Sequence, residues 1–349
     1  MYQYDQLSLL YPALNISGDL KTENKDFIVD ELMPVNMSGN GEHSWLNITK
    51  KNSNTDFVAT QLAKFAGVAA AAVSYAGLKD RNALTTQWFS VHLPGIAEPQ
   101  WSELISDDFK INTVIRHNRK LKRGTLSGNR FEIRLRQLQG EESDWQQRLQ
   151  QIARDGVPNY FGKQRFGHNM NNLKRAFDLV ETNKIRRLKP PKRSIYYSAM
   201  RSWIFNEILS GRIHDKTFTQ ACSGDVMMLA DSHACFAEAI SPEIEARLAK
   251  HEIHLTAALW GKGATMAADE IASREQGVAE QHRAFAESLE KAGMKQERRA
   301  MRLMPVNMKW QFEADNSLIV SFELTKGSYA TAVLRELGAI QDKSLPEFK

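Results

Sequence analysis

An aspartate between two cations is the group in this sequence best placed to do chemistry. Asp80 stands between Lys79 and Arg81, shortly after Gly77 and before an alternating run from Trp88 to Leu93. Neighbouring positive charges lower the pKa of a carboxyl group and favour its ionised form. An ionised carboxylate held on a turn can act as a nucleophile or as a base. A turn aspartate with solvated neighbours is the other interpretation, and the rest of the chain has to decide between them.

The composition is that of an ordinary globular protein with room for two domains. The chain has 349 residues, of which 42% are apolar and 25% are charged. Residues 1–5 lack the basic and apolar segments of a signal peptide, and the longest apolar run, Val68 to Val73, is too short to cross a bilayer. The two cysteines, Cys222 and Cys235, fit a reducing compartment rather than a disulfide framework. We therefore expect a cytoplasmic protein without a membrane segment.

Positive charge is concentrated in two stretches. From Lys110 to Arg136, nine Lys or Arg residues stand against one acid, Glu132, and from Lys184 to Arg193 six of ten residues are basic and none is acidic. Such blocks attract polyanions, of which phosphate backbones are the commonest. The charge pattern indicates nucleic-acid binding, with a solvated basic face as the alternative.

Strand patterns occur at both ends of the chain. Alternation and β-branching predict strands at 26–29, 45–49, 88–93, 130–136 and 318–324. A helix is predicted from N-cap candidates at 54–56 to about Gly67, and a short one at 331–337. Asp80 therefore falls in the connection between a helical region and a strand, where rigid elements can position a loop.

The middle of the chain has helical periodicity. Helices are predicted at 143–154, 172–182, 198–210, 242–249 and 271–292. The chain from about Gly156 to Leu303 is accordingly expected to be mainly helical with little strand, and to be broken once at Pro190-Pro191. Strand-rich ends around a helical middle predict a domain inserted into a split, β-rich core.

Common cofactor and metal motifs do not fit this sequence. The glycines and lysine at 261–265 lack the spacing and the preceding strand of a phosphate loop, and 251–254 is not a zinc-binding His-Glu-x-x-His helix. Cys222, His233 and Cys235 lack a suitably spaced fourth metal ligand. A Gly-x-Ser-x-Gly nucleophile elbow is also missing. We therefore expect neither a metal nor a cofactor.

Five segments resemble, in their order, the motifs of the TruD family of transfer-RNA pseudouridine synthases. The resemblance covers most of the chain. The segments are Gly77-Leu78-Lys79-Asp80-Arg81-Asn82-Ala83-Leu84-Thr85-Thr86-Gln87, 126–131 with its Gly-Asn-x-Phe motif, 157–167, 192–206 and 326–337.

The resemblance implies a fold and its domains. The fold would be the pseudouridine-synthase core, an α+β fold with a mixed, mostly antiparallel sheet flanked by helices. A TruD-specific domain would be inserted in it, with residues 1–154 and 304–349 forming the catalytic core and 155–303 the insert. This agrees with the split core that the strand and helix patterns predict.

The resemblance also implies a reaction, the isomerisation of uridine to pseudouridine at position 13 of transfer RNA. Nothing is added or lost, so the reaction needs no cofactor. The N-glycosidic bond must break, the base must turn over, and a carbon–carbon bond must form. The family's catalytic aspartate corresponds to Asp80, which would attack either C6 of the base or C1′ of the sugar. The uridine must also leave its stack to reach the nucleophile.

Substrate-binding candidates follow from the same resemblance. Tyr329 stands where many members have phenylalanine, and its ring would hold the flipped base. Its added hydroxyl could also form a hydrogen bond with Asp80 or act as an acid or a base. Asn129 corresponds to an asparagine that contacts the uracil edge, because an amide offers both a donor and an acceptor; an ordinary turn asparagine after Gly128 is the alternative.

Three further candidates surround the expected site. Phe27 corresponds to a substrate-contacting aromatic residue, although Asn24-Lys25 replaces the proline that many members have ahead of the Asp-Phe pair. Phe131 belongs to the apolar face of its strand, so a core position competes with a substrate contact. Lys21 is the candidate cation that orients Asp80, with a surface lysine as the alternative.

Nine cations are candidates for contacts with RNA phosphates, which position a protein on RNA rather than specify sequence. They are Lys79, Arg119, Lys120, Lys122, Arg123, Arg186, Arg187, Lys192 and Arg193.

Two other functions compete with an RNA-modifying isomerase. One is an RNA-binding or RNA-folding factor that has lost catalysis, but such a protein would be expected to have lost some of Asp80, Asn129 and the aromatic ring at Tyr329. The other is a nucleotide hydrolase that uses Asp80 as a base. This sequence lacks the metal-binding carboxylate cluster or the phosphate loop that such an enzyme needs. We expect transfer RNA as the partner, no protein partner and no membrane. A monomer is expected because no self-complementary apolar patch is evident in the sequence.

Overall fold

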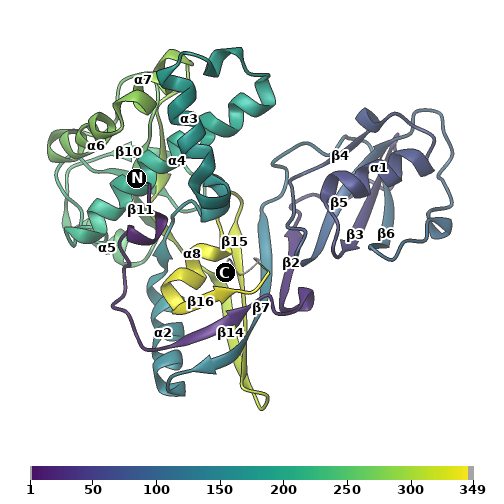
Figure 1. The fold of residues 1–349 in the computed structure, drawn as a ribbon, viewed down its shortest axis with the longest axis horizontal. Helices are drawn as coiled ribbons and strands as arrows, with labels where there is room; N and C mark the ends of the chain where they lie inside the picture. Colours follow the sequence, from purple (N-terminus) through teal and green to yellow (C-terminus); the bar gives the residue numbers. More distant parts are fainter. Residues whose placement is uncertain (1, 345–349) are drawn as a thin grey trace. The chain divides into compact units, whose positions relative to one another are not determined.

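Residues 2–344 are described in a computed structural model, in which the chain divides into two compact units (Figure 1). The first, here called the helical unit, comprises the chain up to Ala13, Asp155–Met304 and Thr331–Glu336. The second, the sheet unit, comprises Leu14–Arg154, Pro305–Ala330 and the chain from Leu337. The catalytic core and insert predicted at 1–154 with 304–349 and at 155–303 stay a prediction.

A ten-stranded sheet organises the sheet unit, and its main path runs β14-β15-β7-β2-β5-β3-β6. Two described pairs, β1 with β16 and β2 with β5, are parallel, and the other pairs of this sheet are antiparallel. The predicted α+β fold with a mixed, mostly antiparallel sheet is therefore confirmed. The strands are β1 (Ser17–Leu20), β2 (Phe27–Leu32), β3 (His43–Lys50), β4 (Val73–Tyr75), β5 (Leu84–His92), β6 (Phe109–His117), β7 (Gly128–Gln139), β14 (Val306–Glu313), β15 (Ser317–Thr325) and β16 (Ala339–Asp342).

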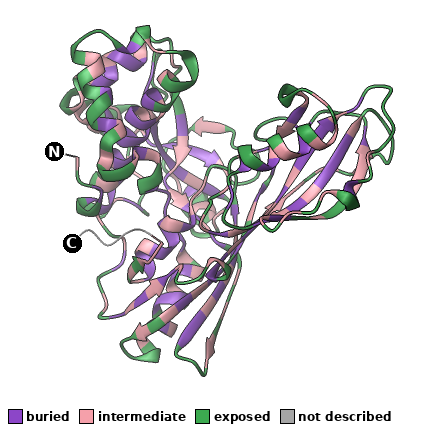
Figure 2. Cartoon of the chain, turned by 45° about the vertical axis from the view of Figure 1, so that its right-hand side comes forward, coloured by how far each residue is buried: buried purple, intermediate pink, exposed green. Residues whose placement is uncertain are grey.

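Strand β7 forms where the sequence alternates most clearly. Phe131, Ile133 and Leu135 are buried, whereas the neighbouring Arg130 and Glu132 are exposed. Figure 2 shows this alternation of buried and less buried residues along the strands of the sheet. Successive side chains of a strand point to opposite faces, so one face of β7 packs in the core while the other stays polar.

Helix α1 (Thr55–Phe65) covers one part of this sheet. Its Val58 and Leu62 pack with Ile48 of β3 and Phe89 of β5 in a buried apolar cluster. Each such side chain contributes about 1.5–3 kcal/mol when it is fully buried. The helix ends at the predicted place, before Gly67, which adopts the left-handed φ of 65°. The sheet unit also contains α2 (Glu142–Asp155) and 3-10 turns at Asn24–Asp26, Ala70–Ala72 and Trp101–Glu103. Helix α8 (Ala330–Leu337) belongs to the helical unit from Thr331 to Glu336.

The helical unit combines helices with two small sheets, so the prediction of little strand between Gly156 and Leu303 is wrong. A four-stranded sheet runs β10-β9-β11-β12, and β13 pairs with β8. These strands are short and continuously apolar in places, as in Val226–Leu229, a pattern that periodicity cannot distinguish from a buried helix. The elements are β8 (Val157–Pro158), α3 (Asn171–Glu181), α4 (Pro190–His214), β9 (Val226–Leu229), β10 (Cys235–Ala237), α5 (Pro242–Ala249), β11 (Ile253–Leu259), α6 (Asp269–Gln281), α7 (Arg283–Lys291), β12 (Glu297–Ala300) and β13 (Arg302–Leu303), with 3-10 turns at Tyr4–Gln6, Lys163–Phe166, His168–Met170 and Ile185–Arg187.

Two helix boundaries differ from prediction for local reasons. Pro190 and Pro191 do not break a helix but begin α4, because proline fits the first helical turn, where its missing N–H is not needed. The helix predicted over 271–292 is divided at His282, whose φ of −111° and ψ of 36° are not helical.

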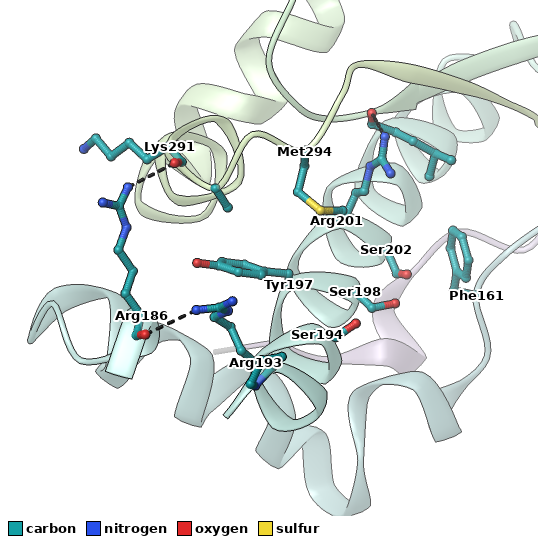
Figure 3. A pocket seen from close by; sticks show the side chains of 13 residues that line it. Phe161, Arg186, Arg193, Ser194, Tyr197, Ser198, Arg201, Ser202, Lys291 and Met294 are labelled. Carbon is teal, nitrogen blue, oxygen red and sulfur yellow. Dashed lines mark hydrogen bonds between the residues drawn. The ribbon is translucent and has the colours of Figure 1, made fainter. Parts of the chain in front are cut away.

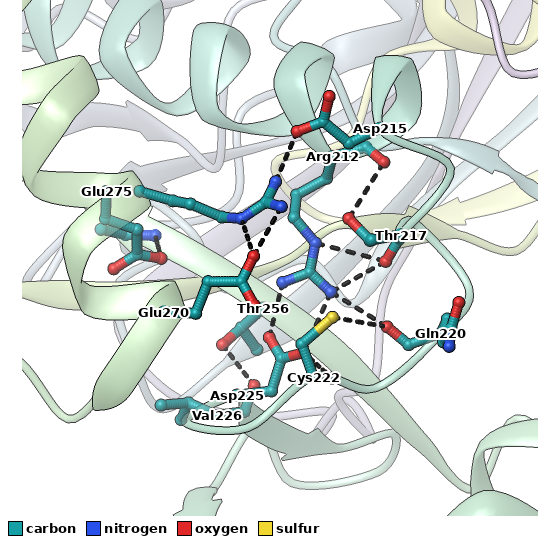
Figure 4. Close-up of polar contacts among 12 residues, drawn as sticks. Arg212, Asp215, Thr217, Gln220, Cys222, Asp225, Val226, Thr256, Glu270 and Glu275 are labelled. Carbon is teal, nitrogen blue, oxygen red and sulfur yellow. Dashed lines mark hydrogen bonds and ion pairs between the residues drawn. The ribbon is translucent and has the colours of Figure 1, made fainter.

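A buried ion pair ties α4 to the loop before β9 (Figure 4). The Arg212 guanidinium donates to Asp225 Oδ1 at 2.8 Å and to Oδ2 at 3.0 Å, and the side chains are 4% and 1% exposed. Arg212 also donates to the carbonyl oxygens of Thr217 and Gln220, at 2.8 and 3.1 Å. One buried side chain thus satisfies a carboxylate and two carbonyl groups of the same loop.

Within residues 2–344, no helix has the length and apolar character that crossing a membrane requires. Cys222 and Cys235 are free thiols. The described part of the chain contains no cluster of three or more His, Cys, Asp or Glu residues suited to a metal ion.

We expect Arg212→Met to lower the free energy of unfolding of the helical unit by about 3–5 kcal/mol, because it leaves Asp225 charged, buried and unpaired. Urea denaturation followed by circular dichroism measures this loss. The double variant Arg212→Met with Asp225→Leu should recover part of it. Arg283→Met is the matched control, since Arg283 is exposed and pairs with Glu287 on the surface; equal losses in Arg212→Met and Arg283→Met would contradict the prediction.

Candidate active site

The loop that carries Asp80 joins β4 to β5, and buried polar side chains hold its backbone. Thr55 Oγ1 accepts the backbone N–H of Lys79 at 3.0 Å and donates to Gln87 Oε1 at 3.0 Å. Gln87 Nε2 in turn donates to the carbonyl oxygen of Gly77 at 3.2 Å. Thr55 and Gln87 are 1% and 0% exposed. The loop therefore has fixed attachment points on α1 and on β5.

Lys50, the last residue of β3, holds the backbone of Asp80 itself. Its ammonium donates to the carbonyl oxygen of Asp80 at 2.8 Å and to that of Ser53 at 2.8 Å, and the residue is 1% exposed. Burial lowers the pKa of Lys50 to about 8, although the charge of Asp80 raises it. A buried ammonium costs free energy, which its hydrogen bonds to carbonyl groups partly offset.

The Asp80 carboxylate has two donors. Lys21 Nζ lies 2.5 Å from Oδ2, and the backbone N–H of Asn82 donates to Oδ1 at 3.0 Å. Burial by itself raises the pKa of Asp80, but the hydrogen bond and charge of Lys21, the N–H of Asn82 and the charge of Lys50 outweigh it and hold the pKa below its usual value. The side chain is still 42% exposed. Asp80 is thus an ionised carboxylate that solvent, and therefore a substrate, can reach.

Lys21 occupies a strained backbone position directly after β1. Its φ of 56° lies in the left-handed region, which a non-glycine residue rarely adopts. The side chain is 10% exposed, and its ammonium lies 4.7 Å above the ring of Phe27 and also pairs with Asp342 at 3.7 Å. In this conformation the Lys21 side chain reaches Asp80; its role as the orienting cation stays a prediction.

Lys79 lies inside the sheet unit, unlike the exposed cations with which it was grouped. Its side chain is 8% exposed, and its ammonium lies 3.0 Å from Glu31 Oε1 and donates to Asn129 Oδ1 at 2.6 Å. Burial raises the pKa of Glu31, whereas the Lys79 charge and the N–H of Trp88 lower it in part. In this position Lys79 orients the Asn129 amide.

The two phenylalanines predicted at the site pack together behind Lys21. Phe27 and Phe131 are each 7% exposed, and their ring centroids are 6.1 Å apart in an edge-to-face arrangement. Phe131 also contacts Phe322 of β15, with 5.5 Å between the ring centroids. They form an apolar wall against the cation of Lys21.

Tyr329 is half-buried at the N-cap position of α8. The loop that leads to it follows β15, whose Thr325 and Leu324 pair with Gly128 and Asn129 of β7. The backbone N–H of Lys326 also donates to the carbonyl oxygen of Ser127 at 3.0 Å. The segments of Tyr329 and Asn129 are therefore joined through the ladder between β15 and β7.

Arg119, Lys120, Lys122 and Arg123 are exposed on the loop between β6 and β7. The loop is anchored by the buried Leu121, which packs with Trp45, while Trp45 Nε1 donates to the carbonyl oxygen of Arg119 at 2.9 Å. None of the four cations lies within ion-pair distance of a carboxylate among residues 2–344. This loop is thus a strip of uncompensated positive charge.

The remaining predicted cations belong to the helical unit. Arg186 and Arg187 end the 3-10 turn before α4, and Lys192 and Arg193 lie in its first turn. Arg186, Arg187 and Lys192 are exposed, and Arg193 is half-buried.

The structure brings together Lys21, Asp80, Phe27 and Phe131 on one side, and Lys79 and Asn129 on the other, within the sheet unit. Three polar residues of the site, Lys50, Glu31 and Gln87, were not predicted from the sequence. A signal was present for each, since they stand where the period-two pattern of β3, β2 and β5 calls for apolar residues. A charged or amide group in such a register indicates a buried polar contact.

Comparison with known proteins gives a consistent result. The model of the family described as tRNA pseudouridine synthase D (TruD) matches residues 7–183 and 170–337. Curated proteins named tRNA pseudouridine synthase D are similar over nearly their whole length: that of Hydrogenovibrio crunogenus is 45% identical over 91% of this chain and 92% of its own, and that of Aeromonas hydrophila is 45% identical over 95% and 94%. That of Methylococcus capsulatus is 40% identical over 99% and 97%.

A solved structure shares the fold. The crystal structure of a Methanosarcina mazei protein, assigned provisionally as tRNA pseudouridine synthase D, superimposes with a TM-score of 0.74 over 95% of each chain, at 21% identity.

We expect Lys21→Met to raise the pKa of Asp80, because burial raises it and Lys21 supplies the leading opposing contributions. Carbon-13 labelling of aspartate carboxyl groups measures this titration, with the Asp80 resonance identified from Asp80→Asn. Lys21→Arg should retain the low pKa, since it keeps the charge. Lys25→Met should not change it, because Lys25 is exposed and pairs with Glu23. An Asp80 titration that is the same in Lys21→Met and Lys25→Met would exclude the ion pair as its cause.

Proposed function

We propose that this chain isomerises uridine to pseudouridine in transfer RNA; it belongs to the tRNA pseudouridine synthase D (TruD) family, whose model and curated members match most of its length. The observation that carries the proposal is the ionised, accessible carboxylate of Asp80, held by Lys21 on a loop whose backbone is fixed. We further propose that the target is uridine 13 in the D arm, which the family resemblance implies.

In the proposed reaction Asp80 is the nucleophile. Its carboxylate forms a bond to C6 of the base or to C1′ of the ribose, and the bond between C1′ and N1 breaks. The base turns so that C5 faces C1′, the new carbon–carbon bond forms, and Asp80 is released. C5 loses a proton and N1 gains one, so that substrate and product have the same atoms. The reaction therefore needs no metal or cofactor.

The uridine would have to leave its stack to reach Asp80. The ring of Tyr329 is the proposed stacking surface for the flipped base, a contact worth about 1–3 kcal/mol. The exposed part of Phe27, with Phe131 behind it, would form the apolar wall of the uridine site. Leu78, two residues before Asp80, is 70% exposed and is an apolar side chain that could occupy the vacated stack.

Asn129 would read the uracil edge as a donor. Its Oδ1 is held by the Lys79 ammonium, which has no acceptor, so the amide orientation is fixed. Its Nδ2 has no hydrogen-bond partner among the described residues and is available to a uracil carbonyl oxygen. We therefore propose for Lys79 a positioning role in place of a phosphate contact.

The proposed partner is transfer RNA, bound by a monomer in the cytoplasm. Arg119, Lys120, Lys122 and Arg123 of the sheet unit are the proposed contacts to its phosphates, together with Arg186, Arg187, Lys192 and Arg193 of the helical unit. Their support is the lack of a carboxylate partner for the first group among residues 2–344 and the density of positive charge in the second.

We expect Asp80→Asn to abolish turnover while RNA affinity stays within about threefold, since phosphate contacts supply most of the affinity. Carbodiimide labelling and primer extension on unmodified transfer RNA detect the product as a new stop. Wild-type protein should give a stop at uridine 13, and an RNA with cytidine there should give none. Tight binding without any stop would instead favour the inactive RNA-binding factor, and a large loss of affinity in Asp80→Asn would assign that residue a structural role.

Replacing Arg119, Lys120, Lys122 and Arg123 by Gln should weaken transfer-RNA binding and flatten its salt dependence. The slope of log K against log salt should fall by about one for each phosphate that the loop no longer neutralises. Filter binding between low and physiological salt measures it. Lys25→Gln with Arg130→Gln is the control, because these exposed cations of the same unit are paired with Glu23 and Glu323. A slope that the four replacements leave unchanged would remove this loop from the binding surface.

A further inference from the structure

A pocket of about 660 Å³ lies within the helical unit (Figure 3). Its walls are the first half of α4, Arg186 of the preceding 3-10 turn, and the turn after α7 that contains Met294. The volume is in the range of small-molecule sites. None of the described lining residues is acidic, whereas Arg186, Arg193, Arg201 and Lys291 are cations.

The partners of these cations divide them into two groups. Arg201 pairs with Glu297 at 3.0 Å and Lys291 with Glu287 at 2.8 Å, so their charges are compensated. The Arg186 guanidinium donates to the carbonyl oxygen of Lys291 at 3.0 Å, and Arg193 donates to that of Arg186 at 3.3 Å. Among residues 2–344, no carboxylate forms an ion pair with either of these two arginines. Their positive charge remains available to an anion in the pocket.

Hydroxyl groups continue the polar lining along α4. Ser194, Ser198 and Ser202 are spaced four residues apart and lie on one side of the helix, over about 12 Å. Tyr197 is 8% exposed, and Figure 3 shows its hydroxyl directed into the space near Arg186. Within the described residues this hydroxyl has no hydrogen-bond partner. This hydroxyl is therefore available to donate to, or accept from, a ligand in the pocket.

The other end of the pocket is lined by apolar side chains together with Arg201. Phe161 lies near Ser202 in this part of the pocket, and Leu259 and Met294 also line the pocket. Phe161 is fixed by the Arg299 guanidinium, 4.2 Å from its ring centroid, and by an edge-to-face contact with Phe205. The pocket thus offers the guanidinium groups of Arg186 and Arg193 at one end, hydroxyl groups along its length, and at the other end apolar surface beside Arg201, whose charge Glu297 compensates.

We propose that this pocket binds one nucleoside monophosphate unit. The phosphate would lie between Arg186 and Arg193, which with the Tyr197 hydroxyl supply charge-assisted donors. The ribose would face the serine hydroxyls, and the base would lie against Phe161 and Met294. Either an unpaired nucleotide of the RNA or a free nucleotide has this chemistry. Only the RNA source rests on the proposed function.

The binding experiment uses full-length Asp80→Asn protein, so that turnover does not enter. Calorimetric titrations with UMP, AMP, uridine and inorganic phosphate should show saturable binding of the monophosphates, about tenfold tighter than of uridine or phosphate. Arg186→Gln and Arg193→Gln should each weaken this binding about tenfold. Arg187→Gln and Lys192→Gln are the matched controls: they lie in the same basic run but do not line the pocket, and should leave the mononucleotide affinity unchanged. Tyr197→Phe should weaken binding without lowering the melting temperature.

A second titration separates the two sources. If unmodified transfer RNA displaces UMP, and Arg186→Gln weakens RNA binding more than Arg274→Gln does, the ligand is a nucleotide of the RNA; Arg274 is paired with Asp215 and Glu270 and does not line the pocket. If RNA affinity is the same in the two variants, the ligand is a free nucleotide. The proposal is overturned if no monophosphate binds saturably, or if inorganic phosphate binds as tightly as UMP. A protein that binds UMP here but forms no pseudouridine would refute the proposed reaction and leave the pocket standing.

Discussion

The candidate active site depends on the register of strand β7. This strand pairs with β2 on one side and with β15 on the other, so that Glu31 and Leu324 both lie opposite Asn129. The close approach requires Gly128, because a Cβ at that position would lie 2.3 Å from the carbonyl oxygen of Leu324. A slip of one residue would turn the Asn129 side chain to the other face of the sheet. One strand therefore sets the position of the amide, of its Lys79–Glu31 support, and of the loop that leads to Tyr329.

The loop of Asp80 is positioned by groups that an optimally stable core would not contain. Lys50 is buried without a carboxylate partner among the described residues, and its lowered pKa shows that the environment disfavours its charge. An apolar residue there would avoid this cost but would leave the Asp80 carbonyl group without its donor. The left-handed backbone of Lys21 is a second local cost at the same place. Such departures from local preference are expected where geometry serves chemistry rather than stability.

Sequence patterns predicted five of the ten strands of the large sheet, β2, β3, β5, β7 and β15, because alternation indicates a half-buried strand directly. The strands β1, β4, β6, β14 and β16 were not predicted. β7 and β15 were found within a few residues of their ends, whereas β9, with Val226 to Leu229 all apolar, has no such pattern. Asp80 became a candidate because charge beside a turn is visible locally and the family motif surrounds it, whereas Lys21 became one only through the family resemblance. Lys50 and Glu31 were missed because the predicted strands ended at residues 49 and 29, one and two residues before the positions whose register marks them as buried.

Carboxylate pairing decides which cations a polyanion would meet. The chain has 46 Lys and Arg against 41 Asp and Glu, a modest excess. Lys79 and Arg212 are each matched by a buried carboxylate, Glu31 and Asp225, so these charges cancel inside the protein. A carboxylate that is used in a buried pair cannot neutralise a cation on the surface. The basic loop before β7 and the two arginines of the α4 pocket, which have no carboxylate partners among residues 2–344, therefore carry more of the outward field than the net charge indicates. The sequence does not show which cations are paired with a carboxylate and which are not. Lys79 and Lys122, for example, are both candidates for phosphate contacts in the sequence, and only the structure shows that Lys79 is paired with Glu31.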